Sequence, residues 1–107
     1  MQTIWITGGS TGIGFAVAKK FLEENWRVII SSRNEEKLNK AVEKLKKQTN
    51  KKEIFYKACD VSKYNDVKAT VAYIEKDISK IDIALLNAAA YSPNRTQEFD
   101  IENYNLL

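Results

Sequence analysis

The residues most able to bind a ligand lie near the N-terminus, in the segment TGGSTGIG at positions 7–14. Among its glycines are Gly8, Gly12 and Gly14, in the spacing Gly-x-x-x-Gly-x-Gly. A short run of β-branched and aromatic residues precedes the segment, and apolar residues at helical spacing follow it. A glycine turn between a strand and a helix lets the backbone approach a phosphate, while the helix start offers free N–H groups and partial positive charge. The segment therefore predicts a phosphate-binding loop, to which further donors are added by Ser10, Thr11 and Ile13.

Each of these glycines has its own expected role. Gly8 permits the sharp turn off the strand, Gly12 keeps side-chain atoms away from a pyrophosphate, and Gly14 lets the helix pack tightly on the sheet. A structural alternative stays open, because glycine turns also end strands where no ligand binds. The strand–turn–helix context favours the ligand-binding interpretation.

Few other side chains offer chemistry of their own. The chain has no histidine, and Cys59 is its only cysteine, so neither a metal cluster nor an intrachain disulfide is expected. Cys59 is interpreted as a small buried residue. The net charge of +3 does not favour nucleic acid. A lysine cluster over residues 44–52 is interpreted as a solvated helix end, with RNA binding as a remote alternative.

No apolar run approaches 18 residues, and the N-terminus lacks the basic and apolar regions of a secretion signal. We therefore expect neither membrane insertion nor secretion, and the cytoplasm is the expected location.

The elements that must position the glycine segment alternate along the chain. Strands are predicted at residues 3–7, 27–31, 53–59 and 81–87. Helices are predicted from Ile13 to about Asn25, after a capping Asn34, and after a capping Ser62. Residues 88–95 are expected to form a loop, and Gln97 to begin a fourth helix. The alternation predicts a doubly wound α/β fold, with a parallel sheet and helices on both faces. At 107 residues, the chain is expected to form a single domain.

Four landmarks in order resemble the short-chain dehydrogenase/reductase family over essentially the whole chain. The first is the Thr-Gly-x-x-x-Gly-x-Gly pattern, matched by Thr7, Gly8, Gly12 and Gly14. The others are SSRNEEKL after the second predicted strand, CDVS after the third, and LLNAAA at the end of the fourth. The resemblance implies a Rossmann-type fold with strand order 3-2-1-4.

The resemblance also implies which residues meet a dinucleotide. Ser32, Arg33 and Asn34 would lie at the ribose, and Asp60 and Val61 at the adenine. Asn87, Ala88 and Ala89 would lie toward the nicotinamide. The LLNAAA segment departs from the family's Asn-Asn-Ala-Gly, because Leu86 replaces the first Asn and Ala89 the closing Gly. Ala89 therefore adds a methyl group where the backbone and the nicotinamide run close.

Arg33 bears on the choice of cofactor. NAD-type sites place an acidic residue at the end of the second strand, and none stands at residues 31–33. A guanidinium can instead form a bidentate contact with a 2′-phosphate. NADP is therefore expected in preference to NAD, and an ordinary surface arginine is the alternative.

The family's catalytic Ser and Tyr-x-x-x-Lys are not found after the LLNAAA segment. Tyr64 and Lys68 match the Tyr-x-x-x-Lys spacing, but they follow the third predicted strand, on the adenine side, and the match is rejected. Asn105 is a candidate for the family's helix-borne catalytic Asn. A truncated gene, a fragment and a portion of a larger enzyme are all compatible with this pattern.

The sequence thus predicts the NADP-binding portion of a short-chain dehydrogenase/reductase, which in the intact enzyme transfers hydride between NADP(H) and a carbonyl or alcohol. The alternative is a stand-alone nucleotide-binding or interaction module without redox activity. Since no fifth strand is predicted, the fourth strand would expose one edge, and a homo-oligomer formed through that edge is expected.

Overall fold

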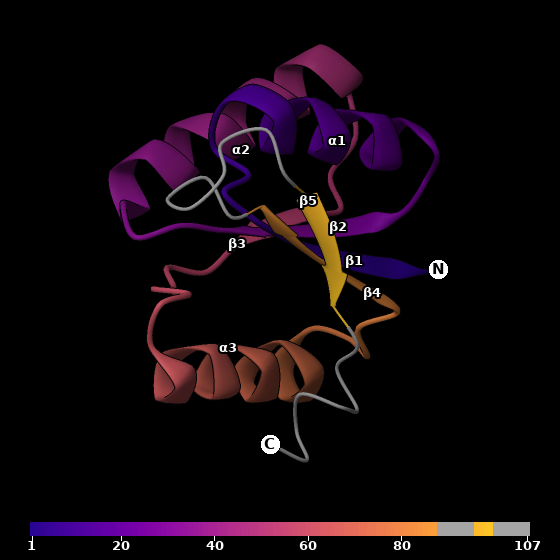
Figure 1. Ribbon diagram of the computed structural model, residues 1–107. Helices are drawn as coiled ribbons and strands as arrows, with labels where there is room; N and C mark the ends of the chain where they lie inside the picture. Colours follow the sequence, from indigo (N-terminus) through magenta and orange to yellow (C-terminus); the bar gives the residue numbers. More distant parts are fainter. Residues whose placement is uncertain (88–95, 100–107) are drawn as a thin grey trace.

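The computed structural model describes residues 1–87 and 96–99 of the chain. The elements are, in order, β1 (Thr3–Thr7), α1 (Gly12–Glu23), β2 (Arg27–Ser31), α2 (Glu35–Thr49), β3 (Ile54–Tyr56), α3 (Tyr64–Asp77), β4 (Ile83–Asn87) and β5 (Thr96–Phe99). They form one sheet of order β3-β2-β1-β4-β5, in which the first four strands are parallel and β5 is antiparallel (Figure 1). The predicted α/β fold with strand order 3-2-1-4 is confirmed.

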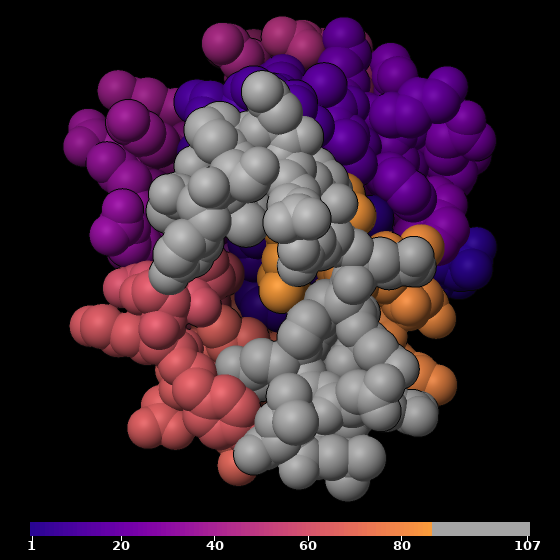
Figure 2. Space-filling view, in the orientation of Figure 1, coloured from indigo at the N-terminus to yellow at the C-terminus, as the bar shows by residue number. Residues whose placement is uncertain are grey.

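The sheet lies between two helical layers. Helices α1 and α2 cover one face and α3 covers the other (Figure 1), and Figure 2 shows the indigo and purple atoms of the first layer opposite the red atoms of α3. Side chains alternate along β1, so Ile4 and Ile6 pack toward α1 and α2 while Trp5 packs toward α3. Both faces of the strands are thus buried, which explains why the strand sequences are almost continuously apolar.

Local sequence signals set the helix boundaries on the α1 and α2 side. The Asn34 side chain caps α2 by accepting a hydrogen bond from the Lys37 N–H at 3.0 Å. Asn25 follows α1 with a φ of +68°, in the left-handed region expected of a residue that ends a helix. The buried face of α2 is its predicted apolar stripe of Leu38, Ala41, Val42 and Leu45.

Two boundaries near β3 differ from the sequence prediction. The strand is confined to Ile54–Tyr56, because only these residues pair with β2. Helix α3 begins at Tyr64 after the N-cap residue Lys63, so the prediction that Ser62 caps the helix is wrong. The Ser62 hydroxyl and N–H both donate to the Asp60 carboxylate, which places Ser62 in the turn before the helix.

The C-terminal prediction is also wrong where the structure describes it. Gln97 lies in β5 rather than in a helix, and β5 pairs with β4 in a register that joins Asn87 to Thr96 and Leu85 to Glu98. The edge of β4 is therefore paired with β5 and is not exposed. The expected homo-oligomer was argued from an exposed β4 edge, and that premise is wrong. The physical reason is that unpaired backbone groups on a buried strand are costly, so a nearby segment pairs with them. The predicted loop at 88–95 and the remainder of the predicted helix, 100–107, lie outside the described residues.

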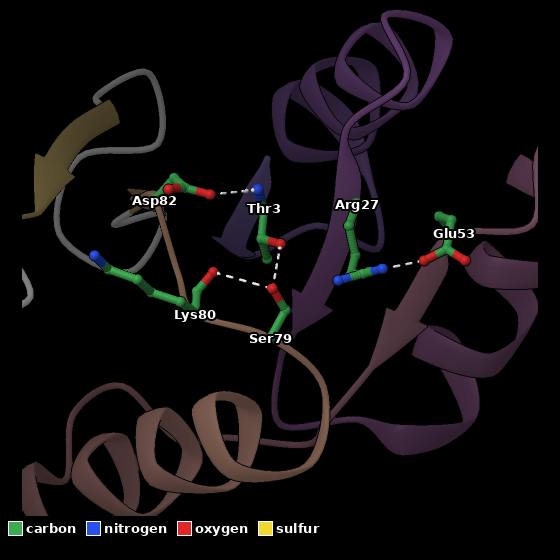
Figure 3. Close-up of polar contacts among 6 residues, drawn as sticks. All are labelled: Thr3, Arg27, Glu53, Ser79, Lys80 and Asp82. Atoms are coloured by element: carbon green, nitrogen blue, oxygen red, sulfur yellow. Dashed lines mark hydrogen bonds and ion pairs between the residues drawn. The ribbon is translucent and has the colours of Figure 1, made fainter. Parts of the chain in front are cut away.

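Polar contacts secure the amino ends of the strands, opposite the glycine loop. Asp82 accepts a hydrogen bond from the Thr3 N–H at 2.8 Å and returns one from its own N–H to the Thr3 carbonyl at 2.9 Å. Figure 3 shows the first of these contacts, the Thr3 hydroxyl donating to Ser79 at 3.0 Å, and Arg27 paired with Glu53 at 2.7 Å. These contacts hold the strand starts in register and leave the opposite edge of the sheet for a site.

Within the part of the chain that the structure describes, no helix combines the length and apolar character that crossing a membrane requires.

Candidate functional site

The loops that follow β1, β2 and β3 meet at the carboxyl edge of the sheet. The Gly8 N–H donates to the Ser31 carbonyl at 2.7 Å, which ties the glycine loop to the end of β2. The Cys59 N–H donates to the Ser32 carbonyl at 2.8 Å, which ties the loop after β3 to the loop after β2. Three segments singled out in the sequence therefore lie side by side. This is the edge where open α/β sheets bind ligands.

The glycine loop has the geometry of an anion-binding turn. Gly8 and Gly12 have φ values of +68° and +60°, in the region that favours glycine. Among the residues that the structure describes, no atom lies within 4 Å of a Cβ built on Gly12, so these residues leave the space in front of it open. The Thr11 side chain does not cap α1, and the first turn of α1 holds no acidic residue. The partial positive charge at the start of α1 is thus left for an anion.

Gly14 allows close packing of α1, as expected, but the contact is with the backbone of Gly8. A Cβ there would lie 2.1 Å from the Gly8 carbonyl oxygen and 2.7 Å from its carbon. Helix α1 therefore packs against the glycine loop itself, whereas the sequence analysis placed this contact on the sheet.

Gly9 is a residue that the sequence analysis missed. A Cβ on Gly9 would lie 2.5 Å from Cγ2 of Ile30, so only glycine lets the loop pass over β2 at this point. The signal available in the sequence was the pair of adjacent glycines at positions 8 and 9.

The loop after β2 exposes Arg33 and turns Ser31 inward. The Ser31 hydroxyl is buried and accepts a hydrogen bond from the Trp5 indole at 2.9 Å. Arg33 is exposed, and its charge contributes to holding the pKa of Asp60 below the usual range. The Asn34 side-chain oxygen is occupied in capping α2, while the Ser32 hydroxyl contacts the Asn34 backbone at 3.3 and 3.4 Å. Arg33 is therefore the cation that this loop offers to a ligand.

The turn after β3 places a carboxylate and an apolar side chain at the same edge. The Asp60 Oδ1 accepts hydrogen bonds from the Ser62 N–H at 3.0 Å and from the Ser62 hydroxyl at 2.6 Å. These contacts are the main cause of the lowered pKa of Asp60, with Arg33 and Lys63 adding to it. The carboxyl is therefore ionised at neutral pH. Val61 and Ile13 are each 44% exposed, although both side chains are apolar.

Of the remaining predicted site residues, the structure describes Asn87 but not Ala88, Ala89 or Asn105. Asn87 ends β4 at the same edge of the sheet, and its backbone pairs with Thr96. Ala88, Ala89 and Asn105 lie outside the described residues. Tyr64 opens α3, on the side of the Asp60 turn.

The described residues were also considered for a metal-binding cluster and for a reactive thiol at Cys59. Among residues 1–87 and 96–99, no three His, Cys, Asp or Glu side chains gather closely enough to hold a metal ion. Cys59 is only 3% exposed, and burial raises the pKa of its thiol, with nearby carboxylates adding to the effect. Cys59 is therefore a protonated packing residue at neutral pH.

A parallel four-stranded core with a glycine turn between β1 and α1, next to the point where the strand order reverses, defines a Rossmann-type fold. Residues 2–106 match the family model for short chain dehydrogenase, and the chain belongs to this family.

Curated relatives agree with this assignment. The chain is 41% identical over 91 residues to chlorophyll(ide) b reductase NOL, chloroplastic, of Oryza sativa subsp. japonica, covering 83% of this chain and 26% of that protein. It is 34% identical over 103 residues to glucose 1-dehydrogenase of Gluconobacter oxydans, covering 96% of this chain and 38% of that protein. The chain thus spans well under half the length of these relatives.

Solved structures share the fold. A variant of actinorhodin polyketide ketoreductase with NADPH superposes with a TM-score of 0.74 at 28% identity, covering 81% of this chain and 33% of that one. L-sorbose reductase from Gluconobacter frateurii, complexed with NADPH and L-sorbose, superposes with a TM-score of 0.70 at 29% identity, covering 78% and 31%.

Proposed function

We propose that residues 1–107 form one domain that binds NADP, and that the whole protein transfers hydride between NADP(H) and a carbonyl or alcohol substrate. The observation that carries this proposal is the open space before Gly12, at the start of an uncapped helix and beside the loop that exposes Arg33. A pyrophosphate in front of Gly12 would meet the backbone N–H groups at the start of α1 without obstruction by a side chain of residue 12. The proposal is supported by the related ketoreductase and sorbose reductase structures, both of which contain NADPH.

We assign the residues as follows. The loop residues Gly8, Ser10, Thr11, Gly12, Ile13 and Gly14 form the pyrophosphate cradle. Arg33 binds the 2′-phosphate, with Ser32 and Asn34 as neighbouring donors, and Asp60 and Val61 meet the adenine. The nicotinamide end is assigned to Asn87, Ala88 and Ala89, and Asn105 is the candidate catalytic Asn. When bound, the cofactor supplies the hydride, while the residues of this chain hold and orient it.

The choice of NADP over NAD rests on Arg33. A charge-assisted hydrogen bond contributes about 1.5–3 kcal/mol net, which is roughly 10- to 100-fold in affinity. Calorimetry with 2′,5′-ADP and 5′-AMP therefore tests the proposal, because the two ligands differ only in the 2′-phosphate. We expect the chain to prefer 2′,5′-ADP by about 10-fold or more.

Three variants sharpen this experiment. Arg33→Asp should reverse the preference, since a carboxylate repels the phosphate and accepts a hydrogen bond from a free ribose hydroxyl. Lys47→Asp makes the same change of charge at the far end of α2 and should leave the preference unchanged. Gly12→Val should weaken both ligands together, because it obstructs the pyrophosphate side of the site. Equal affinity of the unmodified chain for the two ligands would remove Arg33 from this role.

A stand-alone nucleotide-binding or interaction module without redox activity is the second candidate function. The two candidates differ in turnover. NADPH oxidation with carbonyl substrates by the whole protein would support the enzyme, and its absence alongside tight nucleotide binding would support the module. A cytoplasmic location stays a prediction, since the rice relative is named as chloroplastic.

A further inference from the structure

We propose that Asp66 is a positioning residue of the nucleotide site, which fixes the Asp60 turn so that the free oxygen of the Asp60 carboxylate reads the 6-amino group of adenine. The inference rests on the proposed function, because it names how one part of that site selects its base. Asp66 itself would touch neither the base nor the phosphates.

The backbone of Asp60 is held from two sides. Its N–H donates to Oδ2 of Asp66 at 2.6 Å, a short contact between a backbone donor and a carboxylate. The preceding residue is anchored to the loop after β2 through the bond from the Cys59 N–H to the Ser32 carbonyl at 2.8 Å. The turn is thus hydrogen-bonded both to the loop after β2 and to α3, and Asp66 provides the hydrogen bond to α3.

Asp66 is itself well placed to hold the turn rigidly. It lies in the first turn of α3 and is partly buried. Its own N–H donates to the Lys63 carbonyl at 3.1 Å, and its carbonyl accepts a hydrogen bond from the Thr70 hydroxyl at 2.8 Å. Its side chain therefore projects from a fixed backbone.

The Asp60 carboxylate has one engaged and one available oxygen. Oδ1 accepts both hydrogen bonds from Ser62, while Oδ2 accepts none from the residues that the structure describes. An ionised carboxylate is purely an acceptor, so Oδ2 selects a donor on the ligand. Adenine presents an amino group at position 6, whereas hypoxanthine presents a carbonyl oxygen there, which a carboxylate repels.

The ratio of affinities for 5′-AMP and 5′-IMP is therefore the measurement, made by calorimetry on the whole chain. We expect the unmodified chain to prefer 5′-AMP by about 10-fold, the effect of one hydrogen bond to a charged group. Asp66→Ala leaves the Asp60 N–H without its acceptor and should bring the ratio close to one, mainly by weakening 5′-AMP. A general loss of stability would lower both affinities alike and leave the ratio unchanged.

Two conservative variants separate position from charge and remain informative if Asp66→Ala does not fold. Asp66→Asn keeps an oxygen acceptor at the same distance and should retain the preference within about 3-fold of the unmodified chain. Asp66→Glu keeps the charge but moves the carboxylate by one methylene, and should lose most of the preference. The opposite order of these two variants would overturn the proposal, as would an unchanged ratio in Asp66→Ala.

The outcome is distinguishable from failure of the proposed function. If the unmodified chain prefers 2′,5′-ADP over 5′-AMP but shows no preference between 5′-AMP and 5′-IMP, NADP binding stands and the role of Asp66 is refuted. If no nucleotide binds, both proposals are refuted together. Asp60→Asn serves as the direct control, because it removes the carboxylate that reads the base and should abolish the preference without disturbing the Asp66 contact.

Discussion

Replacing Gly14 with alanine tests the packing on which the glycine loop depends. Two effects oppose each other at this position. In a helix, alanine is favoured over glycine by about 0.5–1 kcal/mol, so helix propensity alone predicts a stabilised protein. In the structure, however, the new Cβ would lie 2.1 Å from the Gly8 carbonyl oxygen. The sign of the change in unfolding free energy therefore decides between the two effects.

The structure indicates that the steric effect is larger. Since real Cβ atoms essentially never approach another heavy atom within 3.0 Å, α1 and the loop must separate by about 0.9 Å, the difference between 3.0 and 2.1 Å. The atoms in the way belong to the backbone, so they cannot rotate aside as a side chain can. Overpacking costs typically about 1–3 kcal/mol, and subtracting the propensity gain from the upper value leaves a loss of about 2 kcal/mol.

Urea unfolding followed by far-UV circular dichroism measures this loss, provided that the slope of the transition is unchanged. For a chain of this size, about 2 kcal/mol corresponds to a fall of roughly 8–16 °C in melting temperature. Ala16→Gly is the matched control, because Ala16 is exposed on the same helix and reports helix propensity alone. A Gly14→Ala protein as stable as the unmodified chain, or more stable, would refute the close packing of α1 on the loop.

Two further predictions concern residues outside the site. Because the folded pKa of Cys59 is raised above its ordinary value of 9.0, the stability that its thiol contributes is complete below pH 9 and is lost as the pH rises through the folded pKa. Cys59→Ala should remove this alkaline part of the pH dependence, which urea titrations between pH 7 and 10 would show; an identical alkaline loss in both proteins would contradict it. The Arg27–Glu53 pair has side chains 25% and 41% exposed, so a double-mutant cycle with alanine should give a coupling of no more than about 1 kcal/mol. A coupling above about 2 kcal/mol would show that the pair is far better shielded from water than its exposure indicates.

The parallel core of the fold could be predicted because its signals are local and repeated. Apolar strands buried on both faces, helical stripes and the capping residue Asn34 each follow from spacing over a few residues. The error at Gln97 arose because strand or helix there depends on pairing with Leu86 in β4, which lies outside the few residues from which helical spacing is judged. Its neighbours in β5 pair with β4, whose free backbone groups are not visible in the local pattern. Similarly, Ser62 has the side chain of a helix cap, but α3 begins one residue later, after Lys63, and Ser62 lies in the turn that is closed by its hydrogen bonds to the Asp60 carboxylate.

The sequence was sufficient to predict which segments form the candidate site, but not which of their side chains contact one another. Gly12, Arg33 and Asp60 were named from the sequence, and the structure brings their loops to one edge of the sheet. The inward turn of Ser31 toward Trp5 and the contact between Asp66 and Asp60 were not foreseen. Both depend on the distance between side chains on different elements, which composition and spacing do not determine.

The glycine segment combines two requirements that the sequence pattern cannot separate. Gly9 and Gly14 are required by packing, since a Cβ at either position would collide with Ile30 or with the Gly8 backbone. A Cβ on Gly12 would meet no atom of residues 1–87 and 96–99 within 4 Å, so packing among these residues does not explain this glycine, and its positive φ alone would tolerate asparagine at modest cost. Packing thus accounts for a glycine turn after β1 with or without a ligand, which is the structural alternative that the sequence left open. The open space before Gly12 is what distinguishes the two interpretations, and it favours a ligand whose phosphates lie against the start of α1.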